Sequence, residues 1–262
     1  MGERKAPERA DFSNPEHAGY FGDHAARYLR AARWAADRCV VDVACGSGYG
    51  TAMLRQFGAA RSLGLDANES VVDRNREKYG RMGVEFLVAD CQTFDFASLC
   101  PDVVVSFETI EHLSDPEAFV GAVGRALRGD GLFFVSCPND EQLGNNPYHL
   151  HAWDTDGFHR LLARYFGDVI VLGQVPNPSA MASAEFGRYL DFRIGVLWNQ
   201  LWTRVWRAVR QLLGRPPVPA RPEWCNILPG PYDWWFVPDH GPNAISLVAM
   251  CRSPRFPRNH NT

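Results

Sequence analysis

Short apolar runs alternate with helix-like segments through the first two thirds of this chain, and this alternation constrains the fold more than any other feature. The runs are rich in valine and apolar throughout, as strands are when helices cover both faces of a sheet. The predicted strands span 39–43, 62–65, 84–88, 102–107 and 131–136, and the helices between them span 49–57, 70–79 and 116–127. This pattern predicts an α/β fold on a parallel sheet, with the ligand crevice at the carboxyl ends of the strands.

The last third of the chain departs from this alternation. After a loop rich in proline, asparagine and histidine, a helix over 155–165 leads to a strand over 168–172, and a final strand follows at 244–251. The segment between these two strands holds six of the eight tryptophans, which indicates an insertion and, by its length, a substrate cap. The predicted units are a flexible N-terminus (1–14), a core (15–175 with 244–252), the inserted cap (176–243) and a flexible C-terminus (253–262).

Composition narrows the classes of partner and the compartment. The formal net charge of −3 gives no general positive field, so nucleic acid is an unfavoured partner. The seven cysteines are odd in number and none stands in C-x-x-C spacing, which is typical of reduced thiols. The sequence has neither a signal-peptide pattern nor an apolar run near the ~20 residues of a membrane span. We therefore expect a cytoplasmic protein without a transmembrane segment.

A glycine-rich loop follows the first predicted strand and opens the next helix. The stretch 41–50 reads VDVACGSGYG and places small residues where a backbone must turn tightly against a ligand. Asp66 ends the next strand, twenty residues after Gly46, where a carboxylate can accept both hydroxyls of a ribose. The loop has no G-x-G-x-x-G and no lysine for phosphates, which favours a nucleoside ligand without a pyrophosphate, and S-adenosylmethionine is the one we expect.

Four successive stretches resemble the motifs of class I S-adenosylmethionine-dependent methyltransferases: 41–50, 64–66, 89–91 and 107–113. The resemblance covers roughly 15–175 and the last strand, and it implies a Rossmann-like seven-stranded mixed sheet. The cofactor-binding residues that it implies are Ala44, Cys45, Gly46 and Gly48 around the methionine part, Asp66 at the ribose, Asp90 and Cys91 at the adenine, and Phe107 along the methionine; Asp42 and Ala67 complete the set. Ala44 stands where many members have glycine. The alternative is an α/β protein whose glycines only turn the chain and whose acids only cap helices.

A helical pattern over 15–36 precedes the first strand. A helix here would either cover the cofactor as a lid, with Tyr20 in contact with it, or simply pack against the core.

Two groups of titratable residues are candidates for catalysis. Methyl transfer is an in-line displacement that, for a hydroxyl acceptor, also requires removal of a proton. His112, with Glu111 before it, follows the fourth strand, and the ordinary pKa of histidine suits a base at neutral pH. In the second group, resemblance to relatives with an N-P-x-H stretch favours His149 over His151 as the inward-facing residue. The alternative is that Glu111 and His112 only hold their loop, since E-H-L is common across the family.

The run Glu108-x-x-Glu111-His112 with the later His149 also resembles the metal-binding pattern of small-RNA 2′-O-methyltransferases and ubiquinone-pathway O-methyltransferases. Two carboxylates and two imidazoles could hold Mg²⁺ or Zn²⁺, which would lower the pKa of a bound hydroxyl. Without convergence of these groups, which a sequence does not show, base catalysis without a metal stays the preferred interpretation.

The predicted cap contains a helical stretch over 186–213 with a wide apolar face and a tryptophan stripe, and an aromatic cluster over 223–239. The apolar face must be buried against the core, a second subunit of a homodimer, a membrane surface or an apolar acceptor. The aromatic cluster suits stacking on sugar rings or aromatic scaffolds, or forms a small core. Such a cap resembles bacterial small-molecule and sugar O-methyltransferases, including those of antibiotic biosynthesis, and predicts O-methylation of a sugar-containing or aromatic metabolite. The alternatives are an RNA 2′-O-methyltransferase and a non-catalytic S-adenosylmethionine-binding interaction protein.

Overall fold

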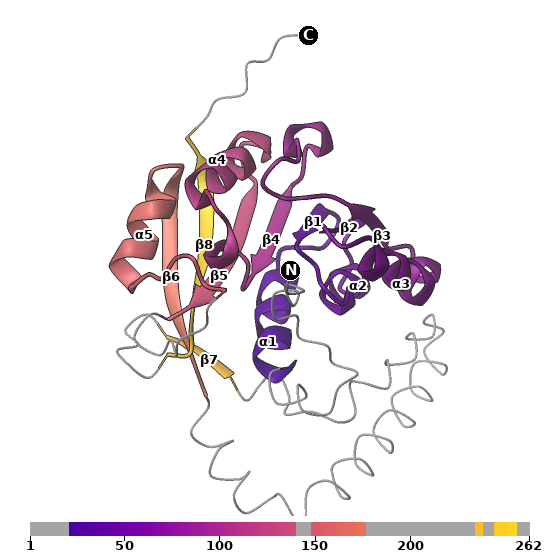
Figure 1. Cartoon of the computed structure of the whole chain (residues 1–262), viewed down its shortest axis with the longest axis horizontal. Helices are drawn as coiled ribbons and strands as arrows, with labels where there is room; N and C mark the ends of the chain where they lie inside the picture. The colour runs from indigo at the N-terminus through magenta and orange to yellow at the C-terminus, as the bar shows by residue number, and fades with distance from the viewer. Residues whose placement is uncertain (1–20, 140–147, 177–233, 238–243, 256–262) are drawn as a thin grey trace, which may run out of the picture.

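The computed structural model describes residues 21–139, 148–176, 234–237 and 244–255. They form one sheet in the order β3-β2-β1-β4-β5-β8-β6-β7, flanked by helices (Figure 1). The strands are β1 (Cys39–Val43), β2 (Arg61–Asp66), β3 (Glu85–Val88), β4 (Val103–Phe107), β5 (Leu132–Pro138), β6 (Phe166–Pro176), β7 (Trp234–Val237) and β8 (Ser246–Pro254). The α-helices are α1 (Phe21–Ala32), α2 (Tyr49–Gln56), α3 (Glu69–Tyr79), α4 (Pro116–Ala126) and α5 (Thr155–Ala163).

The first five strands are parallel, so their carboxyl ends meet at one edge of the sheet. Strand β8 pairs antiparallel with both β5 and β6, and β7 pairs antiparallel with the end of β6. The valine-rich strands bury side chains on both faces, as the sequence predicted. Val40 packs in the cluster beneath α1, α2 and α3, and its neighbour Val41 packs in the cluster beneath α4 and α5.

Side-chain caps define where three of the helices begin. Asn68 accepts a hydrogen bond from Val71 N at the start of α3, Asp115 does the same for α4, and Asp154 for α5. Such caps satisfy backbone donors that a helix cannot pair internally. Helix α2 differs, because its cap is Gly48 in the left-handed conformation and no side chain covers its first N–H groups. The amino end of α2 is therefore left facing the ligand edge of the sheet.

The structure confirms the predicted architecture and adjusts some boundaries. Seven strands match the prediction, and an eighth, β7, comes from within the segment predicted as an insertion. Strand β8 continues to Pro254, so Ser253 and Pro254, which the prediction assigned to a flexible C-terminus, lie in the strand, and Pro254 pairs with Phe166. The helix predicted over 15–36 is described over 21–32 only. Tyr20 and nearly all of the predicted cap, including the tryptophan helix, lie outside the described residues.

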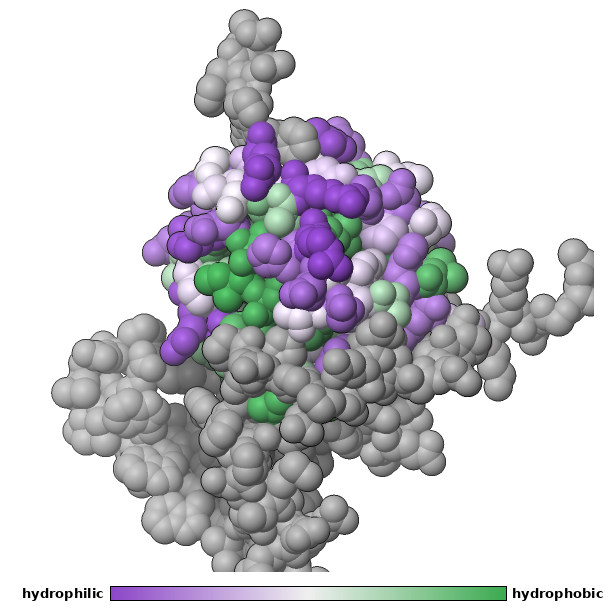
Figure 2. All heavy atoms as spheres, turned by 90° about the vertical axis from the view of Figure 1, so that its left-hand side faces the viewer, coloured by the Kyte–Doolittle hydropathy of each residue, from purple (hydrophilic) through white to green (hydrophobic). Residues whose placement is uncertain are grey.

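The surface that carries α5 and β6 is mixed in character. An apolar patch lies among hydrophilic residues on this side (Figure 2). Ile170 of β6 is 42% exposed. None of the described helices combines the length and apolar character that a bilayer span requires.

Candidate functional site

The loop between β1 and α2 turns through three residues with positive φ. Ala44 has φ 57°, Gly46 has φ 52° and Gly48 has φ 72°. A Cβ on Gly48 would lie 2.7 Å from Asn75 and 2.9 Å from the ring of Phe86, whereas a Cβ on Gly46 would meet nothing within 4 Å. Space therefore requires glycine at position 48. Ala44 occupies a conformation that favours glycine, at the position where many members of the resembled family have one.

Asp66 ties this loop to the end of β2. Its Oδ2 accepts a hydrogen bond from Gly46 N at 3.0 Å, and its Oδ1 accepts one from Asn68 N at 2.9 Å. Asn75 of α3 holds the other side of the loop by donating to Gly46 O at 2.7 Å. Each carboxylate oxygen can accept a second bond. The carboxylate is thus oriented in advance at the ligand edge, with Ala67 exposed beside it.

The candidate adenine residues follow β3 on the same edge. Asp90 is exposed, and its Oδ1 accepts from Gln92 N at 2.9 Å. Gln92 in turn accepts a hydrogen bond from Ser114 N at 2.8 Å, which links this loop to the one after β4. Burial raises the pKa of the Cys91 thiol to about 12, so that side chain is neutral.

Asp42 lies deeper than the rest of the predicted cofactor set. It is 1% exposed, and its oxygens accept hydrogen bonds from Thr51 Oγ1 at 2.6 Å and Tyr28 Oη at 3.1 Å. The Tyr28 ring packs edge-on against Phe107, with 4.9 Å between ring centroids. Asp42 therefore joins β1, α1 and α2 beneath the cofactor loop.

Burial raises the pKa of Asp42 from 3.8 to about 7. The folded protein consequently keeps a proton that the unfolded chain releases between those two values. We expect this group to lower the free energy of unfolding as the pH rises from about 4 to 7, with a slope of up to about 1.4 kcal/mol per unit, and to have no further effect above that range. Urea titrations of the wild type and Asp42→Asn at several pH values measure the difference in slope. Parallel pH profiles for the two proteins would contradict this expectation.

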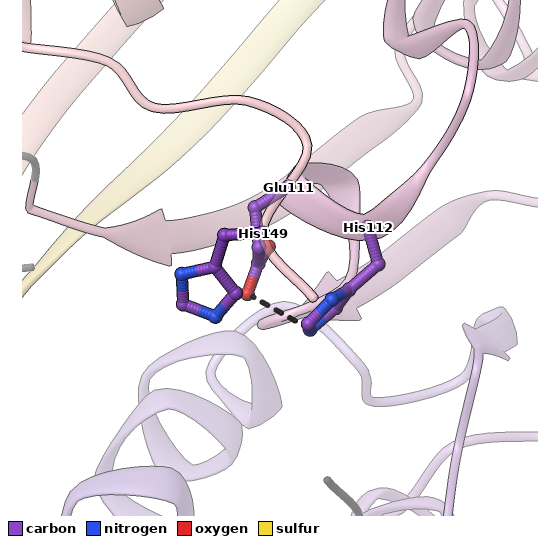
Figure 3. A group of neighbouring side chains, drawn as sticks. All are labelled: Glu111, His112 and His149. Carbon is purple, nitrogen blue, oxygen red and sulfur yellow. Dashed lines mark ion pairs between the residues drawn. The ribbon is translucent and has the colours of Figure 1, made fainter. Parts of the chain in front are cut away.

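The catalytic candidates converge after β4. Glu111, His112 and His149 each offer a ligand or proton-accepting atom, and these atoms lie within 4.8 Å of one another. Figure 3 shows the Glu111 carboxylate between the two imidazoles, with Oε1 3.6 Å from His112 Nε2. Glu111 is 1% exposed, and its Oε2 has no hydrogen-bond partner within the described part of the chain. Burial, reinforced by the Glu108 carboxylate, raises the pKa of Glu111 well above its ordinary value and favours its protonated form.

The backbone around residue 148 defines the tautomer of His112. His112 Nδ1 lies 2.9 Å from Tyr148 O, and a carbonyl oxygen can only accept a hydrogen bond. In the neutral ring the proton is therefore on Nδ1, and the lone pair is on Nε2 beside Glu111. His149 lies next to this ring, with centroids 5.0 Å apart, whereas His151 binds Leu113 O at 3.0 Å. Of the two predicted histidines, the structure brings His149 to the site.

Glu108 points elsewhere, although the sequence grouped it with the metal candidates. Its Oε1 accepts a hydrogen bond from Ser136 Oγ at 2.7 Å and lies 3.4 Å from Arg27 Nη1. Neither Arg27 nor Ser136 was among the predicted site residues. The one signal for Arg27 in the sequence was an arginine inside an alanine-rich helix, and there was no signal for Ser136.

Known proteins of similar sequence identify the family of this chain. A family model described as a methyltransferase domain matches residues 41–135. A protein of Mycobacterium tuberculosis named a probable S-adenosylmethionine-dependent methyltransferase is 33% identical over 202 residues, which are 74% of this chain and 71% of that protein. The chain belongs to the S-adenosylmethionine-dependent methyltransferases. A ubiquinone biosynthesis O-methyltransferase of Mesorhizobium japonicum is 29% identical to this methyltransferase over 207 residues, covering 73% of this chain and 78% of that one.

Solved structures share the fold of this methyltransferase. A methyltransferase in complex with the Haloferax volcanii Trm112 activator matches 96% of this chain and 100% of its own with a TM-score of 0.56 at 16% identity. A methyltransferase of Thermotoga maritima matches 92% of this chain and 96% of its own with a TM-score of 0.54 at 13% identity. These structures confirm the class I architecture, and the relatives in sequence confirm the use of S-adenosylmethionine. The individual cofactor contacts and catalytic roles stay predictions.

The glycine loop of the methyltransferase allows a matched test. Gly48→Ala should lower the free energy of unfolding by about 2–4 kcal/mol, because overlap with Asn75 and Phe86 adds to the cost of positive φ. Gly46→Ala carries the φ cost without overlap, so we expect about 1–2 kcal/mol. Urea denaturation of both variants measures the difference, and equal losses would contradict the packing described here.

Proposed function

We propose that this methyltransferase transfers a methyl group to a hydroxyl of a small-molecule acceptor, with His112 as general base. The observation that carries the proposal is the orientation of His112, whose Nδ1 donates to Tyr148 O and whose Nε2 lone pair is held beside Glu111. The site stands at the carboxyl end of β4, next to the strand that carries the cofactor loop. The ubiquinone biosynthesis O-methyltransferases among the relatives support oxygen as the acceptor atom.

The proposed step balances without a further reactant. The acceptor oxygen attacks the sulfonium methyl, the C–O bond forms as the C–S bond breaks, and S-adenosylhomocysteine leaves as a neutral thioether. The hydroxyl proton passes to His112 Nε2, which acts as the general base. Glu111 Oε1 lies 3.6 Å from this nitrogen and packs beside the imidazole.

The acceptor class is the less specific part of the proposal. We propose a sugar-containing or aromatic metabolite, because the segment 177–233 and its flanks are rich in aromatic residues suited to stacking. The test is incubation with S-adenosylmethionine and panels of phenolic, quinol-type and glycosylated acceptors, with product mass and released S-adenosylhomocysteine as the readouts. Methylation of a hydroxyl in one panel supports the proposal. Methylation only of amines or carbon, or of RNA with steeply salt-dependent binding, overturns it.

A divalent metal is a second candidate for activating the acceptor. Glu111, His112 and His149 fit such a group, because their ligand atoms converge and the Nδ1 contact of His112 leaves Nε2 available for coordination. A bound cation would lower the pKa of a coordinated hydroxyl. Activity that survives chelation would exclude this arrangement and leave the base mechanism.

We also propose a cytoplasmic location and a homodimer.

A further inference from the structure

Arg27 is a buried guanidinium that joins helix α1 to the far strands of the sheet. Its side chain is 1% exposed. Its nitrogens contact Asp23 Oδ2 at 3.2 Å, Gln174 Oε1 at 2.7 Å and Ser246 Oγ at 3.0 Å. Gln174 also donates to the backbone oxygen of Asp23 at 2.9 Å. The helix is therefore held to β6 and β8 by polar contacts that exclude water.

The remaining face of this guanidinium meets Glu108, the first residue after β4. Glu108 has φ 52°, a left-handed conformation that disfavours any residue with a Cβ. Two groups oppose this strain: Ser136, which bonds both the backbone N–H and the carboxylate of Glu108, and Arg27 Nη1 at 3.4 Å. Strain of this kind persists only where surrounding contacts hold it, and it gathers at functional sites.

The conformation of Glu108 determines the direction of the segment that follows it. Three residues later, Glu111 O accepts hydrogen bonds from Leu150 N at 2.8 Å and His151 N at 3.2 Å, and His112 then reaches Tyr148 O. The strained residue is thus the point from which the Glu111–His112 turn departs. A relaxed Glu108 would redirect that turn away from the 148–151 backbone.

We propose that Arg27 is a positioning residue that acts through Glu108 to hold His112 in the Nδ1–H tautomer. The inference rests on the proposed function insofar as that function assigns His112 its role.

Stability alone gives a weak reason for this cluster. Buried ion pairs are often no more stabilising than apolar residues of similar size. Moreover, Arg27 Nη1 meets the Glu108 carboxylate at 3.4 Å as an ion pair without a hydrogen bond, and Asp23 Oδ1 has no hydrogen-bond partner within the described residues. A role in fixing the conformation of the loop after β4 explains why two carboxylates and a guanidinium are buried together.

The test reads the His112 tautomer directly and needs no acceptor. Long-range ¹H–¹⁵N spectra of chelator-treated full-length protein at about pH 8, where an ordinary imidazole is neutral, report which ring nitrogen carries the proton, with His112→Gln giving the assignment. Arg27→Lys keeps the charge but not the forked contacts. Asp23→Asn/Arg27→Met/Glu108→Gln removes all three charges together and so avoids an unpaired buried carboxylate. Arg61→Lys is the control, since Arg61 forms an exposed pair with Glu85.

We expect the wild type and Arg61→Lys to show the Nδ1–H form, and both cluster variants to show the two tautomers at comparable population with unchanged S-adenosylmethionine affinity. Once an acceptor is identified, turnover of the cluster variants should fall about 100-fold with little change in KM, as expected for a misplaced group. Wild-type tautomer spectra in both variants would overturn the positioning role. Altered tautomers combined with a fully active His112→Ala would instead overturn the base assignment and leave the positioning role standing.

Discussion

Asp66→Ala should weaken binding of S-adenosylmethionine by about 100-fold to 10,000-fold. The expected loss combines two charge-assisted hydrogen bonds to the ribose, each worth about 1.5–3 kcal/mol. The substitution also removes the acceptor that holds Gly46 N in the cofactor loop. Calorimetric titration with the cofactor and with S-adenosylhomocysteine gives the affinities.

Asp73→Ala is the matched control for this experiment, because Asp73 is an exposed aspartate that pairs with Arg76 at 3.0 Å. Circular dichroism of both variants verifies that the fold is intact. An affinity for Asp66→Ala within about twofold of the control would remove the ribose assignment, since one hydrogen bond to a charged group is already worth more.

His112→Ala should lower turnover about 100-fold to 10,000-fold while leaving cofactor affinity unchanged, which is the range that a positioned general base contributes. Steady-state kinetics on an identified acceptor, repeated with a chelator, measure this effect and separate it from metal assistance.

His149→Ala belongs in the same series, since its ring lies 5.0 Å from that of His112 and the two share Glu111. His159→Ala on α5 serves as the control, because its side chain is exposed and lies outside the convergent group. Full activity in both site variants would show that these histidines hold the loop and do not move the proton.

Much of the core could be predicted because its signals are local. Each valine-rich run of five or six residues requires cover on both faces, and a short strand followed by a glycine-rich turn places that turn at the ligand edge. Asp66 was found in the same way, by its position at the end of a strand. The spacing of these residues along the chain was enough to order them in space.

The polar cluster behind the site could not be found in this way. Arg27 meets Gln174 and Ser246, which lie 147 and 219 residues away in sequence, and no periodicity encodes such contacts. Glu108 shared a spacing pattern with Glu111 and His112, yet its positive φ turns its carboxylate toward α1. The direction in which a strained residue points its side chain depends on its tertiary partners. Sequence spacing therefore grouped Glu108 with Glu111 and His112, although the fold separates them.

Gln174 of β6 and Ser246 of β8 are direct partners in an antiparallel ladder, although about seventy residues of chain lie between them. The two ends of that intervening stretch are thus held side by side by the sheet itself, and a short hairpin turn could join them. For an engineer, this makes 175–245 a replaceable cassette. Grafting the corresponding stretch of another family member onto the same ladder would exchange the segment that the sequence predicts to be a substrate cap, while the first five strands keep their places in the sheet.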